Sequence, residues 1–536
     1  MKSMDDLNVS VPSKKSLVVR NIKNVSKKQR EEALKKTEYN MFSFPADLLV
    51  LDFLSDSGSG AMTDLQWSGL FHGDESYGRN KGYYVLLEAI RDIFERGDNY
   101  QRKIDLILYG ERDPQKLMEE IYLKSFEGGF ANGGIFQLEY PNAFIVPQGR
   151  CAEFLLFSTI SSILRIYSSE ENFFIPNNGH FDTTEANIAA SGMVPINFFS
   201  ENLLSDFPIS KLGKENDFKG NMDVDRLDEF ISEKGSDKIP LIYLTITNNT
   251  AAGQPVSLKN IKEVSDMAEK YGIPLFFDAC RFAENAYFIK KYENGYGSYS
   301  INEIVKKMFS YADGFTISFK KDGLANIGGG LFFRDRGVFH SKFSNGQDIG
   351  IRLKEKQILT FGNDSYGGLS GRDIMALAIG LYEVVNESYL ENRLNILNEF
   401  GRKLAKNNVP VILPPGGHAI YLNMDKFFSG LNMKPDDFGG VGFTIELLRH
   451  YGIRACELGP FAFEWDKKSS EMRKGILNLV RFALPRNMYD SSHINYAVAA
   501  VTELFKNRES IPKVKINRGA ELRLRHFQSG LIPKYD

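Results

Sequence analysis

Residues 240–278 read PLIYLTITNNTAAGQPVSLKNIKEVSDMAEKYGIPLFFD, and this stretch decides the fold. The apolar, β-branched run 240–247 is typical of a buried parallel strand. After a turn at 252–255, Ser257 can cap a helix with apolar residues at helical spacing, and Gly272 can end it. A second strand over 273–277 closes on Asp278, and a further helix precedes a third strand over 314–319. The pattern predicts repeated βαβ units, and therefore an α/β fold with a mostly parallel sheet.

Polar residues stand where each expected strand stops: Asn249, Asp278 and Lys321. Ligands of open α/β sheets bind beyond the carboxyl ends of the strands, so these three side chains predict a single pocket. Because Asp and Lys end many strands, the residues alone leave a second interpretation open. Asp278 is then a capping residue and Lys321 a solvated charge.

The composition narrows the class of protein. The chain has 536 residues and a net charge of −2, without the clustered basic excess of a nucleic-acid binder. The first 40 residues are rich in Lys and Arg, but acidic residues are mixed among them, which favours a solvated arm. The three cysteines are far apart and the seven histidines form no His-x-x-x-His pair, so no zinc site is expected. No signal peptide or membrane span is apparent, and we expect a soluble, cytoplasmic protein.

Changes in the pattern of apolar, charged and turn residues divide the chain into three parts. Residues 1–57 are expected to form an N-terminal arm and part of a small domain, and 58–390 a large domain with an inserted surface element at about 95–142. Residues 391–536 are expected to form the rest of the smaller α+β domain. There the pattern predicts a helix over 392–407, a strand over 410–413 and another strand through Leu422.

The expected pocket contains candidates for pyridoxal phosphate (PLP) chemistry. This cofactor requires a lysine amine that binds it covalently, a carboxylate that keeps the pyridine nitrogen protonated, and an anion site for the phosphate. Lys321 and Asp278 are candidates for the first two roles.

Long motifs in the chain closely resemble those of the tryptophanase and tyrosine phenol-lyase family, the β-eliminating lyases. They keep the family's order from about Leu17 to Phe527. The motifs are DSG (56–58), GDESY (73–77), QGR (148–150), DACRFAENAYFIK (278–290), SFKKDGLANIGG (318–329), SYGGL (365–369) and GGHA (416–419).

The resemblance implies a PLP-dependent, aspartate aminotransferase-like (fold type I) large domain and assigns its cofactor site. Lys321 resembles the lysine that binds the cofactor and moves the α-proton, and Asp278 the partner of the pyridine nitrogen. Arg281 and Asn249 resemble the partners of the ring oxygen, and Phe181 the aromatic residue that stacks on the ring. The residues that resemble the phosphate-binding set are Gln148, Gly149, Arg150 and Ser318.

The resemblance also implies a substrate site and a cation site. Arg481 matches the anchor of the substrate carboxylate, with Ser55 near it, and Tyr77 matches a general acid contributed across a subunit interface. Each of these residues also has a structural interpretation. Tyr77 could be a packed interface residue and Arg481 a structural salt-bridge partner. His418 could be a core histidine, and Lys320 could either act electrostatically on Lys321 or be a solvated charge. The monovalent-cation (potassium) site corresponds to Gly58, Glu75 and Asn326, and the family implies a homotetramer built from dimers that share active sites.

The family divides by leaving group, and this chain resembles the tryptophanase branch. Asp182, Leu458 and His526 match that branch, and Asp182 can accept a hydrogen bond from the indole N–H. We therefore expect cleavage of tryptophan to indole, pyruvate and ammonia. The chain departs from the family pattern at several positions. They are Phe319, the shorter Pro147–Gln148 junction, and Asn363 and Asp364, which replace apolar residues beside the substrate ring. A phenol-lyase or an enzyme for another β-substituted amino acid remains the alternative. A transaminase or a non-catalytic homologue is less favoured.

Overall fold

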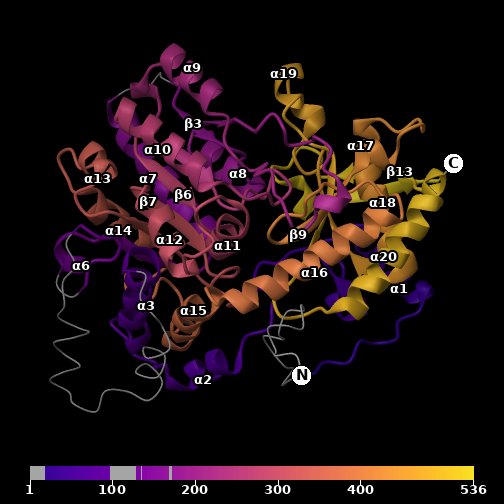
Figure 1. The fold of residues 1–536 in the computed structure, drawn as a ribbon, viewed down its shortest axis with the longest axis horizontal. Coiled ribbons are helices and arrows are strands. Elements are labelled where there is room, and N and C mark those ends of the chain that lie inside the picture. The colour runs from indigo at the N-terminus through magenta and orange to yellow at the C-terminus, as the bar shows by residue number, and fades with distance from the viewer. Residues whose placement is uncertain (1–18, 97–127, 134–135, 168–171, 536) are drawn as a thin grey trace. The chain divides into compact units, whose positions relative to one another are not determined.

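The computed structural model describes residues 19–96, 128–133, 136–167 and 172–535. The chain forms two compact units (Figure 1). The first unit contains Ser57–Leu203 and Phe218–Asn392, together with Met1–Ser13, which lies outside the described residues. The second unit contains Lys14–Asp56, Leu204–Asp217 and Arg393–Asp536. The sequence placed all of 58–390 in one domain, whereas Leu204–Asp217 groups with the second unit.

The first unit is built on a five-stranded sheet with the strand order β2-β8-β7-β6-β5. Strands β5, β6 and β7 are parallel, and β8 runs antiparallel to both of its neighbours. The α/β class with a mostly parallel sheet is therefore confirmed. The strands are β2 (Ala143–Val146), β5 (Ile242–Thr245), β6 (Leu275–Asp278), β7 (Gly314–Ser318) and β8 (Gly329–Phe333).

Local sequence explains the crossover helix α10 (Leu258–Tyr271), which lies between β5 and β6. The Ser257 side chain accepts a hydrogen bond from the backbone N–H of Asn260, and Gly272 ends the helix with φ of 62°. Such an N-cap contributes about 1 kcal/mol to helix stability, and glycine adopts positive φ without a Cβ penalty. The apolar side chains of the helix, among them Ile261 and Val264, are buried, as the helical spacing predicts.

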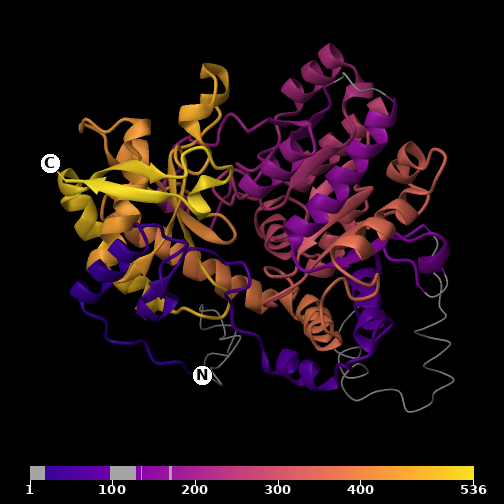
Figure 2. The ribbon, with the colours of Figure 1, turned by 180° about the vertical axis from the view of Figure 1, so that it is seen from behind.

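Helix α7 (Gly149–Tyr167) covers one face of this sheet, and Figure 2 shows it in purple across the strands. Its apolar residues, including Leu155, Leu156 and Ile160, pack with residues of β2, β5, β6 and β8 in one hydrophobic core. The other α-helices of this unit are α2 (Asp64–His72), α3 (Lys81–Arg91), α6 (Phe136–Glu139), α8 (Asp182–Ala190), α9 (Val224–Lys234), α11 (Phe282–Tyr292), α12 (Ile301–Phe309), α13 (Val338–Phe343), α14 (Ile349–Thr360) and α15 (Gly371–Val384).

A short parallel pair, β3 (Phe174–Asn177) and β4 (Val194–Asn197), adjoins the main sheet. Side chains rather than a backbone ladder make the link. The Asn177 amide donates to Thr245 Oγ1 (3.1 Å), and the Asn178 carbonyl oxygen Oδ1 accepts from the backbone N–H of Thr245 (2.8 Å). These bonds place the segment after β3, which leads into α8, beside the end of β5.

The second unit contains a three-stranded antiparallel sheet with the order β11-β12-β9 and a two-stranded hairpin, β13-β14, drawn in yellow in Figure 2. Strand β1 pairs in parallel with β10. The strands are β1 (Leu51–Asp52), β9 (Ala419–Asn423), β10 (Ile453–Arg454), β11 (Cys456–Leu458), β12 (Leu479–Ala483), β13 (Lys513–Arg518) and β14 (Gly530–Lys534). The helices are α1 (Lys27–Lys36), α16 (Glu387–Lys406), which begins in the first unit, α17 (Met424–Phe427), α18 (Gly439–Tyr451), α19 (Ser470–Arg473) and α20 (Ser491–Lys506).

The strand expected over 410–413 is wrong. Only an isolated antiparallel bridge joins Val411 to Leu422. The Ile412 N–H donates to the Tyr421 carbonyl (2.8 Å), but Pro410 and Pro414, two residues to either side, have no N–H with which to extend the pairing into a ladder.

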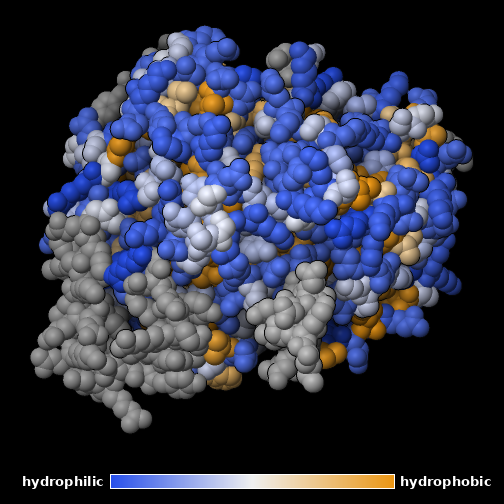
Figure 3. Space-filling view, in the orientation of Figure 1, coloured by the Kyte–Doolittle hydropathy of each residue, from blue (hydrophilic) through white to orange (hydrophobic). Residues whose placement is uncertain are grey.

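Most of the insertion expected at about 95–142 lies outside the described residues. In the described part of the chain, no helix is both long and apolar enough to cross a bilayer. On the face shown in Figure 3, hydrophobic side chains form small scattered groups among hydrophilic ones.

Candidate active site

The predicted polar residues of the first unit stand at the carboxyl ends of adjacent strands. Asp278 is the last residue of β6, where it pairs in register with Thr245 of β5 and Thr316 of β7. The backbone N–H of Lys321 donates to the carbonyl of Ser318, the last residue of β7 (3.3 Å). Asp278 is buried and Lys321 is half-buried.

The turn Gln148–Arg150 lies against the ends of β7 and β8. A Cβ added to Gly149 would lie 2.8 Å from Ser318 Cβ, and one added to Gly329 would lie 2.4 Å from the carbonyl carbon of Gln148. Only glycine fits at such close approaches. The first residues of α7 and the end of β7 thus lie together, and the N-terminus of a helix is a favourable place for a bound anion.

Buried contacts fix the backbone around Asp278. The Asp278 carboxylate accepts from the backbone N–H of Cys280 (3.3 Å), and Cys280 Sγ accepts from the N–H of Ser318 (3.2 Å). Burial, with Asp278 close by, raises the pKa of the Cys280 thiol, so the thiol stays neutral. Arg281 directly precedes α11, and its backbone N–H donates to the carbonyl of Ile246 (3.2 Å). This bond ties Arg281 to the segment that continues from β5 to the buried Asn249.

Helix α8 begins at the predicted aromatic residue. Phe181 is its N-cap, and the buried Asp182 is its first residue. The carbonyl of the preceding His180 accepts from Thr250 Oγ1 (2.7 Å), which joins this turn to the Asn249 segment. The turn that carries the stacking candidate is therefore held at the same edge of the sheet.

Together these residues fit PLP. An anion site, a buried carboxylate and a lysine meet at one edge of the sheet, with an aromatic residue on the adjoining turn. Beside Lys321, Lys320 is also partly buried. This burial, together with the positive charges of Lys321 and Arg150, lowers the pKa of Lys320.

Tyr77 lies on an exposed loop of the first unit. Its side chain is 82% exposed, and its ring meets the Tyr366 ring edge-on at 5.5 Å. The hydrogen bond with Tyr366 raises the pKa of Tyr77. Nearby, Asn363 Oδ1 accepts from the Ser365 hydroxyl (2.7 Å).

A short ionic network stands next to Asn363. The Asp364 carboxylate lies 3.0 Å from both the Arg79 guanidinium and the Lys354 ammonium. The two departures from the family pattern are therefore polar residues with local partners.

Two of the three predicted cation-site residues lie together. The Asn326 amide donates to the carbonyl oxygens of Gly58 (2.9 Å) and Gly60 (3.1 Å). Glu75 is exposed and forms an ion pair with Arg372 (2.9 Å). Among the described residues, no cluster of three or more His, Cys, Asp and Glu side chains forms a metal site.

The substrate-carboxylate candidates belong to the second unit. Arg481 is buried at the centre of β12, in register with Cys456 of β11 and Tyr421 of β9. Its guanidinium donates to the carbonyl of Leu54 (2.9 Å), the residue before Ser55. The strand thus brings Arg481 and the Ser55 segment together, as the sequence predicts.

The same segment has a second attachment. Asp56 and Arg486 form an ion pair (2.9 Å) in which both side chains are almost completely buried. Removing one member would leave the other as an uncompensated buried charge and would destabilise the fold.

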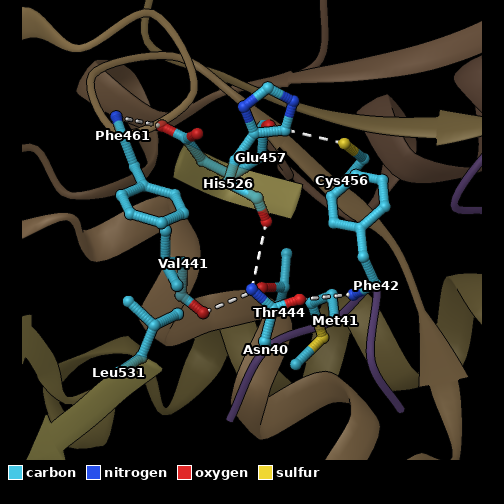
Figure 4. A pocket seen from close by; sticks show the side chains of 10 residues that line it. All are labelled: Asn40, Met41, Phe42, Val441, Thr444, Cys456, Glu457, Phe461, His526 and Leu531. Atoms are coloured by element: carbon cyan, nitrogen blue, oxygen red, sulfur yellow. Dashed lines mark hydrogen bonds between the residues drawn. The ribbon is translucent and has the colours of Figure 1, made fainter. Parts of the chain in front are cut away.

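His526 lines a small pocket of the second unit with Cys456 and Glu457 (Figure 4). Its backbone carbonyl accepts from the Asn40 amide (3.1 Å). The Glu457 carboxylate accepts from the backbone N–H groups of Phe461 (3.1 Å) and Ala462 (3.0 Å), yet burial raises the pKa of Glu457 to about 7.

Two other residues that the sequence analysis singled out, Leu458 and His418, are buried in the second unit. Leu458 ends β11. His418 is completely buried, and its Nε2 lies 3.1 Å from the Tyr421 hydroxyl, as the core-histidine interpretation predicts.

The sequence did not indicate two buried acids that lie beside the predicted cofactor residues. Asp322, directly after Lys321, accepts from the N–H of Ala283 in the first turn of α11 (2.8 Å). Glu153 of α7 contacts Thr184 and Asn187 of α8. Only the positions of these two acids in the sequence could have indicated them. Asp322 follows the lysine, and Glu153 stands four residues after Gly149, on the same helix face.

Comparison with known proteins agrees with this geometry. Residues 52–500 match the family model of the β-eliminating lyases. The chain is 35% identical to a tryptophanase of Salinibacter ruber over 96% of its own length and 93% of the relative's. It is 34% identical to a tyrosine phenol-lyase of Lacrimispora saccharolytica, over 92% of this chain and 90% of that protein. The crystal structure of an aspartate aminotransferase from Thermotoga maritima shares the fold, with a TM-score of 0.51, 12% identity, and coverage of 90% of this chain and 98% of that one.

Proposed function

The chain belongs to the β-eliminating lyase family, and on that premise we propose that it cleaves tryptophan to indole, pyruvate and ammonia. It is a PLP-dependent lyase. When bound, PLP supplies an electron sink for the negative charge that develops at the substrate's α-carbon. The observation that carries the proposal is the meeting of Asp278, Ser318, Gly149 and Lys321 at one edge of the sheet.

In this proposal the residues of the first unit bind the cofactor and move a proton. The Lys321 amine would hold the cofactor aldehyde covalently until the substrate amine replaces it, and the freed amine would then accept the α-proton of the substrate. Asp278, held by the N–H of Cys280, keeps the pyridine nitrogen protonated. Phe181 stacks on the ring, and Arg281 and Asn249 bind its oxygen. The α7 N-terminus binds the phosphate with Gln148, Gly149, Arg150 and Ser318.

Arg481 and Ser55 are proposed to bind the substrate carboxylate. A guanidinium binds a carboxylate through two parallel hydrogen bonds, which fixes its orientation as well as its position. The bond from Arg481 to the Leu54 carbonyl and the Asp56–Arg486 ion pair support this assignment, because both hold the segment in place.

Three residues favour indole over phenol as the leaving group. Asp182 is buried at the start of α8 and offers a carboxylate to the indole N–H. A site that hydrogen-bonds a substrate N–H discriminates strongly against substrates without one. Leu458 presents an apolar surface without an unpaired charge, and His526 is buried with aromatic neighbours.

The deciding experiment is an assay of the purified protein with PLP and potassium. We expect indole and pyruvate from tryptophan, with little or no phenol from tyrosine. Absence of both indole and pyruvate would contradict the tryptophan assignment. Release of pyruvate from another amino acid would support the lyase activity and would identify a different substrate.

The second candidate is β-elimination from an amino acid with a polar β-substituent. It is favoured by one observation: Asn363 and the ion pairs of Asp364 with Arg79 and Lys354 are polar where the family is apolar. Replacing Asn363 with Met would test it. An increase in activity with tryptophan, relative to a smaller substrate such as S-methylcysteine, would show that Asn363 selects against the indole ring.

We also propose that the active sites are shared between subunits of a homotetramer and that a potassium ion binds at Gly58, Glu75 and Asn326. An exposed Tyr77 and an exposed Glu75 suit residues that complete a site on another chain. Mixing Lys321→Ala and Tyr77→Phe subunits tests the sharing, since hybrid dimers would regain one intact site. Mixtures that stay as inactive as the two variants alone would contradict it. Replacing potassium with the larger tetramethylammonium ion should lower the activity.

A further inference from the structure

A buried carboxylate joins the two helices that begin at the cofactor residues. Glu153 of α7 is only 6% exposed. One carboxylate oxygen accepts a hydrogen bond from the Thr184 hydroxyl, and the other accepts from the Asn187 amide (3.3 Å). The same amide lies 3.4 Å from the backbone carbonyl of Arg150. These bonds connect the first turns of α7 with α8.

The position of this link matters because of what precedes each helix. Helix α7 begins at Gly149, in the turn proposed to bind the phosphate, and α8 begins directly after Phe181, proposed to stack on the ring. Thr184 is only three residues past Phe181. A shift of α8 relative to α7 would therefore change the spacing between the phosphate site and the stacking ring.

The Glu153 carboxylate also lies within electrostatic reach of the chemical centre. Burial and the negative charge of Asp278 raise the pKa of Glu153 to about 7, whereas Lys321 and the bonds from Thr184 and Asn187 oppose that rise. The titratable groups that face it are Asp278 on β6, Tyr243 on β5, Lys321 after β7 and Cys151 on its own helix.

We propose that Glu153 is a positioning residue that holds α8 against α7 and places a buried, ionisable carboxyl group near Asp278 and Lys321. The inference rests on the proposed PLP function. In its ionised form, Glu153 would favour the protonated form of the nitrogen that joins Lys321 to the cofactor, since opposite charges attract strongly in a poorly solvated site.

The test compares Glu153→Gln with Thr184→Val and a matched control, Glu229→Gln. Glu229 is exposed on α9, so this control removes one carboxylate without touching the site. PLP dissociation constants and the pH dependence of the bound cofactor's absorbance are measured for each holoenzyme. This absorbance changes when the linking nitrogen loses its proton.

In Glu153→Gln we expect the absorbance midpoint to move to lower pH by roughly half a unit or more, with weaker PLP binding. Thr184→Val removes a bond that favours the carboxylate, so its midpoint should move the same way by less. Glu229→Gln should match the wild type. Unchanged midpoints in both site variants overturn the inference, and Thr184→Val alone decides it if Glu153→Gln does not fold. A wild-type protein that fails to bind PLP contradicts the proposed function instead.

Discussion

At the scale of single residues, Arg481 combines two tasks that a substitution can separate. Its guanidinium donates to the Leu54 carbonyl, and the same group is proposed to bind the substrate carboxylate. Lysine keeps the charge but lacks the planar fork, so it cannot make both contacts in the same geometry.

We therefore predict that Arg481→Ala raises the KM for the amino acid roughly a hundred-fold, with the absorbance of bound PLP unchanged. Arg481→Lys should recover only part of the loss. Steady-state kinetics and the cofactor spectrum check this together. An unchanged KM in the alanine variant would show that Arg481 has only a structural role.

Asp182 allows a second prediction at this scale. Asp182→Ala should lower kcat/KM for tryptophan by roughly a hundred-fold or more, but should change elimination from S-methylcysteine much less, because that substrate has no ring N–H. Equal losses for both substrates would assign Asp182 to the helix rather than to the leaving group.

The sequence indicated the polar residues that follow strands, but it did not indicate the residues that hold the surrounding helices in place. Asp278 and Lys321 could be predicted because a polar residue after an apolar run is visible in the chain. Glu153 could not, because a glutamate in a helix is ordinarily solvated, and its partners Thr184 and Asn187 lie more than 30 positions away.

At the scale of elements, the contact between the N-terminus of α7 and the end of β7 sets the geometry of the proposed phosphate site. A methyl group on Gly149 would meet Ser318 Cβ at 2.8 Å, a distance that real side chains do not adopt. Local signals predicted β5, β6, β7 and α10 well, since caps and apolar runs act within a few residues. The strand expected at 410–413 failed because the pattern of apolar residues took no account of missing N–H donors.

We predict that Gly149→Ala weakens PLP binding by roughly ten-fold or more, because α7 must move away from β7 to make room for the methyl group. Gly297→Ala is the matched control, since an added Cβ there lies 4.0 Å from its nearest neighbour. Cofactor titration followed by absorbance measures both. Equal affinities in the two variants would mean that the contact is unimportant for the cofactor.

At the scale of the whole molecule, buried acids make stability depend on pH. Burial raises the pKa of Glu153 in the first unit and of Glu457 in the second to about 7. An acid whose folded-state pKa lies above its ordinary value of 4.5 stabilises the fold at low pH, and that contribution is lost as the pH rises from 4.5 to about 7. His180 acts in the opposite sense, because burial lowers its pKa to about 3 and favours the neutral ring.

Glu457→Gln isolates one of these contributions. Relative to the wild type, this variant should gain about 2 kcal/mol of stability between pH 5.5 and pH 8, because glutamine never ionises. Thermal unfolding of the apoprotein at both pH values measures the difference. A variant that follows the wild-type pH dependence would show that Glu457 ionises normally in the folded protein.

The second unit is assembled from three stretches of chain, and its parallel pair β1-β10 joins residues that are far apart in the sequence. The Asp52–Arg454 ion pair spans 402 residues. At about 5–20 residues per second, a ribosome needs roughly 20–80 seconds to cover that distance. During that time the first unit can already fold, whereas Leu51 and Phe53, which are buried in the finished protein, remain without their partners. These two apolar side chains thus lack their β10 neighbours until the ribosome has synthesised Arg454.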